Sequence, residues 1–239
     1  MRKPNMPQTL QIDFVSDVAC PWCAVGLWSL ERALEKLGGE SDFAVPVSIS
    51  FQPFELNPKM PPEGQDVTEH LTQKYGSTPE QQVGMRETLR QRGAAVGFTF
   101  RLEGRSRMWN TFDAHRLLHW AGEQSAQLQL ALKKALLSAY FTDGDSTASH
   151  AVLVRVAASV GLDTSRAAQI LASDEFTAEV RQAQQFWQSQ GISAVPSVVI
   201  NKQHLIQGGQ PPEAFEQALR QIAGQITDQT AGQTAAGTV

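Results

Sequence analysis

The chain has 239 residues, of which 41% are hydrophobic and 18% charged, and its formal net charge is −4. This length and composition are typical of a globular protein with one large domain or two small ones. The slight acidity argues against a nucleic-acid-binding protein, and no stretch reaches the roughly 20 apolar residues of a membrane-spanning helix. Residues 4–8 read PNMPQ where a signal peptide would carry its apolar segment, so we expect a cytoplasmic protein.

The first predicted strand covers residues 9–15, where apolar and polar side chains alternate. A helix is expected to begin at Pro21, because proline suits the first helical position, where its missing N–H leaves no hydrogen bond unmade. Leucines at helical spacing continue this helix, and Gly38-Gly39 predicts its end.

The two cysteines of the chain stand between this strand and this helix, in the sequence Cys20-Pro21-Trp22-Cys23. A helix N-terminus directs unpaired N–H groups and the positive end of the helix dipole at the residue that lies there. The Cys20 thiol should therefore ionise more easily than a free cysteine, and the thiolate is the reactive form. The Cys23 thiol lies on the same helix face and can close a disulfide with it. The motif thus predicts dithiol–disulfide exchange.

A structural disulfide and a zinc site account less well for the cysteine pair. A purely structural disulfide would tend to be reduced in the cytosol. A zinc site would need two further ligands, from histidine or carboxylate. His115 and His119 stand one helical turn apart, a spacing that can bind metal, but no third ligand is evident in the sequence around them. We interpret both histidines as packing or helix-surface residues and expect no metal.

A second strand, over residues 45–54, would complete a right-handed βαβ unit with parallel strands. The chain is then almost entirely helical in character until about residue 172. Helices are expected over residues 110–121, 126–141 and 149–160. This block has the pattern of a helical insertion into another fold.

Strand-like sequence returns near the C-terminus. A helix over residues 174–190 precedes two short predicted strands, at residues 197–200 and 204–207, and a last amphipathic helix. The order βαβ, helical insertion, αββα predicts an α/β protein with a thioredoxin-like, four-stranded mixed sheet and a large all-helical insertion domain. The predicted boundaries are residues 1–64 and 173–226 for the thioredoxin-like domain, 65–172 for the insertion and 227–239 for a flexible tail.

Five stretches spread over the chain have distinctive sequences: SDVACPWC at residues 16–23, FQPFELNP at 51–58, NTFDAHR at 110–116, AYFTDG at 139–144 and GGQPP at 208–212. In this order they resemble segments of the DsbA-like thioredoxin superfamily, and specifically of its FrnE-like cytoplasmic branch. The resemblance extends over most of the chain and supports the same thioredoxin fold with a helical insertion.

The resemblance implies a thiol–disulfide oxidoreductase or isomerase in which Cys20 is the nucleophile and Cys23 the resolving thiol. It also implies a cis peptide bond between Val195 and Pro196 that faces the cysteines. A proline is essentially the one residue that permits such a bond. The Val195 backbone would then be free to pair with an extended substrate. Substrates would be thiols or disulfides of proteins or of glutathione, with glutathione as a redox partner and no other cofactor.

Further residues are candidates for substrate contact or proton transfer. Pro21 and Trp22, between the cysteines, should lie at the rim of the site. Asn110 opens an insertion helix that we expect to cap the active-site face. A buried carboxylate could accept the Cys23 proton, and Asp13 and Asp17 are the candidates, although a role at the strand end or in capping accounts for either residue as well.

Two other functions remain open from the sequence. The chain is also similar to kappa-type glutathione transferases and 2-hydroxychromene-2-carboxylate isomerases, which typically have serine at the leading active-site position, so Cys20 together with Cys23 argues against them. A non-catalytic, chaperone-like binder could use the cleft between the sheet and the insertion. The sequence fits a monomer or a homodimer.

Overall fold

The computed structural model describes residues 9–40, 43 and 45–235 of the chain. Its elements are β1 (Leu10–Ser16), α1 (Pro21–Gly38), β2 (Val47–Pro53), β3 (Gln65–Asp66), α2 (Val67–Tyr75), α3 (Pro79–Val96), β4 (Arg107–Met108), α4 (Phe112–Gln124), α5 (Ala126–Ser138), the π-helical turn η1 (Ala139–Asp143), α6 (His150–Ser159), α7 (Thr164–Leu171), α8 (Thr177–Ser189), β5 (Ser197–Ile200), β6 (His204–Gln207) and α9 (Pro212–Ala235). Residues 1–8 of the predicted first domain and 236–239 of the predicted tail lie outside the described residues.

Four strands form one mixed sheet in the order β2-β1-β5-β6. β1 and β2 are parallel and in register, from Leu10 opposite Val47 to Ser16 opposite Pro53. β5 runs antiparallel to β1, and β6 antiparallel to β5. The predicted four-stranded mixed sheet and its βαβ unit are thereby confirmed.

The two faces of the sheet pack against different helices. On one face, Phe14 of β1 shares a core with α1 and with Phe215 of α9. On the other face, Val15 of β1 packs with Trp187 of α8. Because successive side chains of a strand point to opposite faces, the single central strand β1 contributes to both cores.

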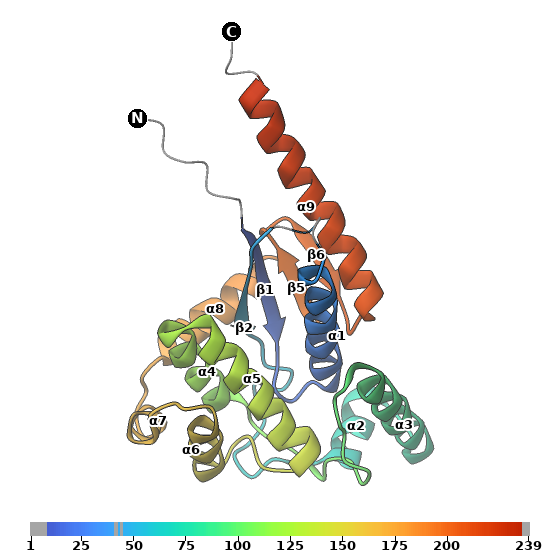
Figure 1. Ribbon diagram of the computed structural model, residues 1–239. Coiled ribbons are helices and arrows are strands. Elements are labelled where there is room, and N and C mark those ends of the chain that lie inside the picture. The colour runs from blue at the N-terminus through green and yellow to red at the C-terminus, as the bar shows by residue number, and fades with distance from the viewer. Residues whose placement is uncertain (1–8, 41–42, 44, 236–239) are drawn as a thin grey trace.

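The helices between β2 and α8 lie around one end of this sheet. Figure 1 shows α2 with α3, and α4 to α7, as two groups near the C-terminal end of β1. Helices α4 to α7 have a core of their own, which includes Leu117, Leu132 and Leu153. The segment predicted to be all-helical also contains a small antiparallel ribbon, because β3 pairs with β4 over two residues each. Strands this short leave no alternation to recognise in a sequence. The domain boundaries near residues 65 and 172 stay a prediction.

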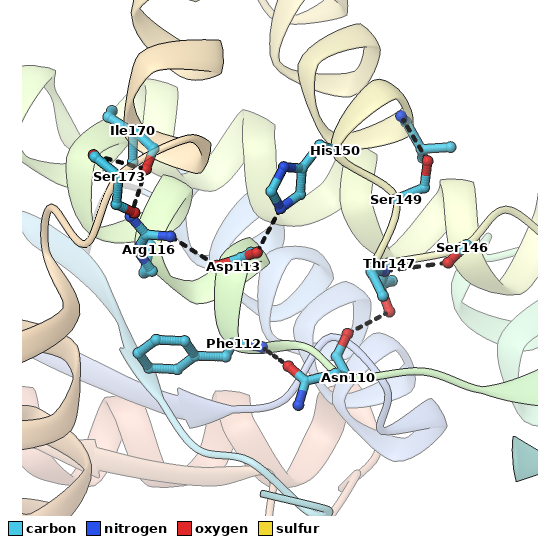
Figure 2. A network of polar contacts seen from close by, with 12 residues as sticks. Asn110, Phe112, Asp113, Arg116, Ser146, Thr147, Ser149, His150, Ile170 and Ser173 are labelled. Carbon is cyan, nitrogen blue, oxygen red and sulfur yellow. Dashed lines mark hydrogen bonds and ion pairs between the residues drawn. The ribbon is translucent and has the colours of Figure 1, made fainter. Parts of the chain in front are cut away.

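Arg116 of α4 joins three of the insertion helices. Its guanidinium donates to the carbonyl oxygens of Ile170 and Ser173, at the end of α7, and pairs with Asp113 at 2.8 Å. Asp113 in turn contacts Nε2 of His150, at the start of α6, at 2.7 Å (Figure 2). A buried guanidinium needs a partner for its N–H groups, and the positions of these acceptors fix α4 against α6 and α7.

The side-chain amide of Gln129 joins α5 to the edge of the sheet. Its Oε1 accepts from the backbone N–H of Phe51 at 2.9 Å, and its Nε2 donates to the carbonyl oxygen of Phe51 at 3.2 Å. Phe51 belongs to the edge strand β2. One glutamine therefore satisfies both backbone groups of a strand residue and holds α5 beside the sheet.

Helix α9 is longer than the sequence predicted. It extends to Ala235, so residues 227–235 continue the helix and do not form the predicted flexible tail. Threonine, aspartate and glycine make this segment a weak helix former, but adding residues to an existing helix costs far less than starting one. None of the helices within the described residues is long and apolar enough to cross a membrane.

Candidate functional site

The two cysteines lie where β1 turns into α1. Cys20 is the N-cap residue of α1, with extended backbone angles (φ −92°, ψ 113°), and Pro21 begins the helix. Both thiols are free and buried, Cys20 at 4% exposure and Cys23 at 0%. The backbone N–H of Cys23 donates to the carbonyl oxygen of Cys20 at 3.0 Å. The prediction that the motif occupies the N-terminus of a helix is confirmed.

The two thiols differ in acidity. A hydrogen bond from Cys23 lowers the pKa of the Cys20 thiol below its usual value, although burial opposes this change. Burial, together with that same hydrogen bond, raises the pKa of Cys23 well above its usual value. Cys20 is therefore the sulfur that ionises first, and the thiolate is the nucleophilic form. The arrangement suits a nucleophile at Cys20 and a resolving thiol at Cys23.

A groove of about 650 Å³ lies in front of Cys20. Pro21, Trp22 and Val195 line it, and the carbonyl oxygen of Val195 is 3.5 Å from Cys20 Sγ. The structure thus brings three of the predicted substrate-contacting residues to the same groove as Cys20.

Pro196 lies behind the lining of the groove. The peptide bond between Val195 and Pro196 is cis, as the resemblance implied. The proline ring is buried against α1, where a Cβ placed on Gly26 would lie 3.1 Å from its Cγ. Glycine at position 26 therefore allows α1 and the Val195-Pro196 turn to approach closely.

Two cations, the carboxylate of Glu55, several neutral polar residues and apolar side chains line the rest of the groove. Lys74 of α2 donates to the Leu56 carbonyl oxygen at 2.7 Å, and Arg105 donates to the Ala19 carbonyl oxygen at 2.8 Å, one residue before Cys20. Tyr75 is 60% exposed on the same wall. Such a surface can contact the backbone, carboxylates and apolar side chains of a peptide.

Asp17 lies in the turn that leads from β1 to Cys20, and it is buried. Its two carboxylate oxygens accept from the N–H groups of Ala19 at 3.1 Å and Leu56 at 2.7 Å, and Nε2 of His115 is 3.5 Å from Oδ1. Burial by itself would raise the pKa of Asp17, but the contact with His115 and the two N–H groups lower it. Asp17 is therefore a well-satisfied carboxylate and a weak base.

Lys133 of α5 completes the set of charged residues around the cysteines. Its side chain is fully buried, and its Nζ has no hydrogen-bond partner among the described residues. Burial lowers the pKa of Lys133, whereas the negative charges of Cys23, Asp17 and Cys20 act to raise it. A basic group therefore stands in the electrostatic field of both sulfurs.

Two of the sequence candidates lie away from the sulfurs or serve the fold. Asp13 is half-buried in β1 and accepts a hydrogen bond from Gln52 Nε2 at 2.7 Å. Asn110 does not line the groove: its Oδ1 accepts from the Phe112 N–H at 2.8 Å at the start of α4 (Figure 2). Its Nδ2 donates to the Met60 carbonyl oxygen at 3.0 Å. Both polar ends of the Asn110 side chain are thus occupied by the backbone around the start of α4, and its contact with substrate stays a prediction.

Lys133 and the contact between His115 and Asp17 were not predicted from the sequence. Lys133 stands in a helix next to Lys134 and among leucines, and a lysine in such a pattern normally faces solvent. His115 gave no signal besides its spacing to His119, which pointed toward metal. His115 reaches Asp17, and Lys133 comes near the cysteines, through helix packing between distant parts of the chain, and no local motif records that packing.

The chain matches the family model of the DSBA-like thioredoxin domain over residues 11–220. Its structure is similar to that of a probable DsbA oxidoreductase, SCO1869, from Streptomyces coelicolor, with 34% sequence identity, 90% of each chain covered and a TM-score of 0.81.

Two more distant relatives agree with this match. The uncharacterized protein YwbO of Bacillus subtilis is 24% identical over 212 residues, which are 88% of this chain and 96% of that protein. The cytosolic disulfide reductase DsbM of Pseudomonas aeruginosa, in a structure with GSH, is 17% identical and shares the fold with a TM-score of 0.59 over 89% of this chain and 98% of its own. With its mixed sheet, its helical insertion and its cysteine pair at the start of α1, the chain belongs to the DsbA-like thioredoxin family.

Proposed function

We propose that the chain is a thiol–disulfide oxidoreductase that exchanges the Cys20–Cys23 dithiol for a disulfide with protein or small-molecule substrates. The observation that carries this proposal is the asymmetry of the pair. Cys20 has a lowered pKa and borders the open groove, whereas Cys23 is fully buried and has a raised pKa. An exchange enzyme needs these two properties in one attacking and one resolving thiol.

In the proposed reaction the Cys20 thiolate attacks one sulfur of a substrate disulfide. The other substrate sulfur leaves with the electron pair of the broken bond, and a mixed disulfide remains on Cys20. Cys23 then attacks Cys20 Sγ and releases the second substrate sulfur as a thiol. The substrate is reduced and the cysteine pair is oxidised; the same steps in reverse oxidise a dithiol.

The groove favours substrates with an extended peptide portion. The Val195 carbonyl oxygen faces Cys20 Sγ, and Lys74 and Arg105 line the groove with two cations. A protein disulfide, or glutathione as an anionic peptide thiol, fits this chemistry. Glutathione is accordingly proposed as a redox partner. The two sulfurs themselves carry the electrons, so no further cofactor is proposed. The proposed compartment is the cytoplasm.

Equilibration of the protein with mixtures of reduced and oxidised glutathione tests the proposal. After each incubation, a bulky maleimide traps the remaining thiols, and a gel shift counts them. We expect a reversible two-electron transition between a form with two trapped thiols and a form with none. The Cys23→Ala variant is the matched control, and it should stop at a mixed disulfide with glutathione.

A cysteine pair that never closes at any glutathione ratio would contradict dithiol exchange. A glutathione-dependent transferase or isomerase would then account for the site better. Protection of an unfolded protein against aggregation by a Cys20→Ser/Cys23→Ser double variant, in the absence of any exchange activity in the wild type, would instead favour a chaperone-like binder.

A further inference from the structure

The groove in front of Cys20 continues past the start of α1 into a second, smaller hollow, the side pocket. It lies between α1, α2, α3 and the loop after α3, and four of its lining residues also line the groove: Pro21, Leu71, Met85 and Arg105. Helix α3 packs against α1, near the C-terminal end of β1 (Figure 1). A substrate bound with its sulfur at Cys20 can therefore extend into the side pocket.

Apolar side chains form most of the side pocket. Besides the residues shared with the groove, they are Val67 of α2, Leu89 of α3, Phe100 and Phe141. The two aromatic rings pack with their centroids 5.4 Å apart, which holds this part of the wall in place. The volume of the pocket is about 80 Å³. Since an apolar cavity of roughly 150 Å³ binds benzene, a pocket of about half that volume accepts an aliphatic side chain of the size of leucine.

The charges around the side pocket are positive. Its lining contains three arginines, Arg86, Arg101 and Arg105, and no carboxylate, although the chain as a whole has a net charge of −4. Arg105 donates to the Ala19 carbonyl oxygen at 2.8 Å, and Arg101 pairs with Glu103 at 3.5 Å. Arg86 is exposed on α3, and no residue that the structure describes accepts a hydrogen bond from it or pairs with it. A ligand with a carboxylate beside its apolar group therefore meets an available cation.

The rim between the groove and the side pocket exposes apolar surface. Met85, which lines both hollows, is 46% exposed, and Tyr75 on the groove wall is 60% exposed. Exposed apolar side chains gathered at a groove mark an interaction site. A flexible methionine can adapt its shape to different partners. Such a rim suits protein segments of varied sequence better than one small molecule of fixed shape.

We propose that the side pocket binds an apolar side chain of a substrate protein, close in sequence to the cysteine that reacts with Cys20, and that Arg86 pairs with a carboxylate beside it. This inference rests on the proposed exchange reaction and names its substrate class: disulfides in protein segments that carry an apolar and an acidic residue near the cysteine. Glutathione has carboxylates but no apolar side chain, so it leaves the side pocket empty.

Mixed disulfides between cysteine peptides and a coloured aromatic thiol test the proposal. The Cys20 thiolate of the reduced protein attacks the peptide sulfur and forms a bond to it. The bond between the peptide sulfur and the aromatic sulfur breaks, and the aromatic thiolate leaves with its electron pair, because the more acidic thiol is the better leaving group. Its absorbance in stopped flow gives the second-order rate constant of the attack for each peptide.

Four peptides of equal length separate the apolar contact from the charge. Leucine or serine stands on one side of the cysteine and glutamate or glutamine on the other, and each peptide is made in both orders. Leucine in place of serine should raise the rate constant about 10-fold, at the low end of what filling an apolar pocket contributes. Glutamate in place of glutamine should raise it about threefold, and this gain should disappear at high salt.

Variants of α3 locate the two contacts. Leu89→Phe fills part of the side pocket, so the ratio of the leucine to the serine peptide should fall to within about twofold of unity. Val83→Ser changes an exposed residue of α3 outside both hollows and should keep the wild-type ratio. Arg86→Met should remove the preference for glutamate and keep that for leucine. Arg90→Met removes an arginine of the same helix that pairs with Glu87, and both preferences should remain.

Two failures are distinguishable. Equal rate constants for the leucine and serine peptides in the wild type, or a full leucine preference in Leu89→Phe, would overturn the side pocket as a substrate site. No release of the aromatic thiolate from any peptide, nor from the mixed disulfide with glutathione, would remove the proposed function itself. Without a preference among the peptides, a dimer of the wild type that Leu89→Phe abolishes in sedimentation would assign the side pocket to a second copy of the chain and overturn the proposal.

The wild type alone decides the question if Leu89→Phe does not fold. In a peptide series with alanine, leucine and tryptophan at the apolar position, the rate constant should rise from alanine to leucine and fall again at tryptophan, which is too large for the side pocket. A rate constant that rises steadily through tryptophan would show general apolar attraction and would overturn the proposal.

Discussion

The two sulfurs of the cysteine pair have different surroundings. In front of Cys20, the Val195 turn and side chains of α1 and α2 line an open groove. Around Cys23 the structure is closed: Asp17, in the turn before the pair, is buried and contacts His115 of α4, and Lys133 of α5 is fully buried. Two sulfurs three residues apart in the sequence therefore meet different dielectric surroundings. Side chains of the helical insertion therefore form part of the surroundings of the pair.

Removal of each sulfur in turn should give the largest contrast between the two sides. Cys20→Ser should reduce the reaction with any disulfide to background, because no thiolate then borders the groove. Cys23→Ala should still attack and should accumulate a mixed disulfide, visible by intact-protein mass spectrometry. If Cys20→Ser retained the mixed disulfide and Cys23→Ala lost it, the assigned roles would be reversed.

Alkylation rates at different pH values measure the difference in acidity between the two thiols. The pKa of Cys20 is lowered, first by the hydrogen bond from Cys23, so its thiolate persists to lower pH than that of a free cysteine, and its alkylation rate falls as the pH drops through that lowered value. Cys23, with a raised pKa, should remain unalkylated at neutral pH. In Cys23→Ala the midpoint for Cys20 should move upward, and an unmoved midpoint would contradict the assigned cause.

The contribution of Asp17 to the closed side can be tested by measuring the free energy of unfolding. Because its pKa is lowered in the folded state, the carboxylate stabilises the protein above the pKa of the unfolded chain, and this contribution is lost as the pH falls through the lowered value. Asp17→Asn should lower the free energy of unfolding by about 3 kcal/mol at pH 7, measured by urea denaturation, since it removes a buried charge from its partners. The difference in the free energy of unfolding between the wild type and Asp17→Asn should become smaller at acid pH. Asp13→Asn, at a half-buried site, is the control, and an equal loss there would contradict the special position of Asp17.

Gln129 tests how firmly the insertion is attached to the sheet. Gln129→Met should lower the free energy of unfolding by about 2 kcal/mol, because it leaves the N–H and carbonyl oxygen of Phe51 without partners. Lys134→Met, at a half-buried ion pair on the same helix, should cost about 0.5 kcal/mol. Equal denaturation midpoints for the two variants would show that the amide of Gln129 contributes nothing beyond a surface contact.

Much of the open side could be predicted from the sequence because its determinants are local. Strand alternation, a proline at the first helical position and glycines at the helix end were enough to place Cys20 at the start of α1. The resemblance added the turn at Val195 and Pro196, and both residues lie at the predicted place.

The closed side could not be predicted, because helix packing creates it. Lys133 and Lys134 are adjacent and chemically identical in the sequence, yet Lys133 is fully buried, whereas Lys134 is half-buried and pairs with Glu31. Only the rotation of α5 about its axis separates them, and an amphipathic pattern with leucines on several sides does not define that rotation to one residue. Asn110 has local partners at the start of α4 and does not line the groove, so its contact with substrate stays a prediction.

The pairing of Gln129 with Phe51 also limits how this protein can associate with itself. β2 is an edge strand, and the unpaired backbone groups of an edge are a template for strand addition by another chain. Side-chain amide groups occupy Phe51 on the outer edge, and Pro53, two residues on, has no N–H to offer. The C-terminal half of the β2 edge therefore cannot pair with a strand of another chain. The same glutamine that anchors the insertion thus blocks strand addition at this part of the sheet.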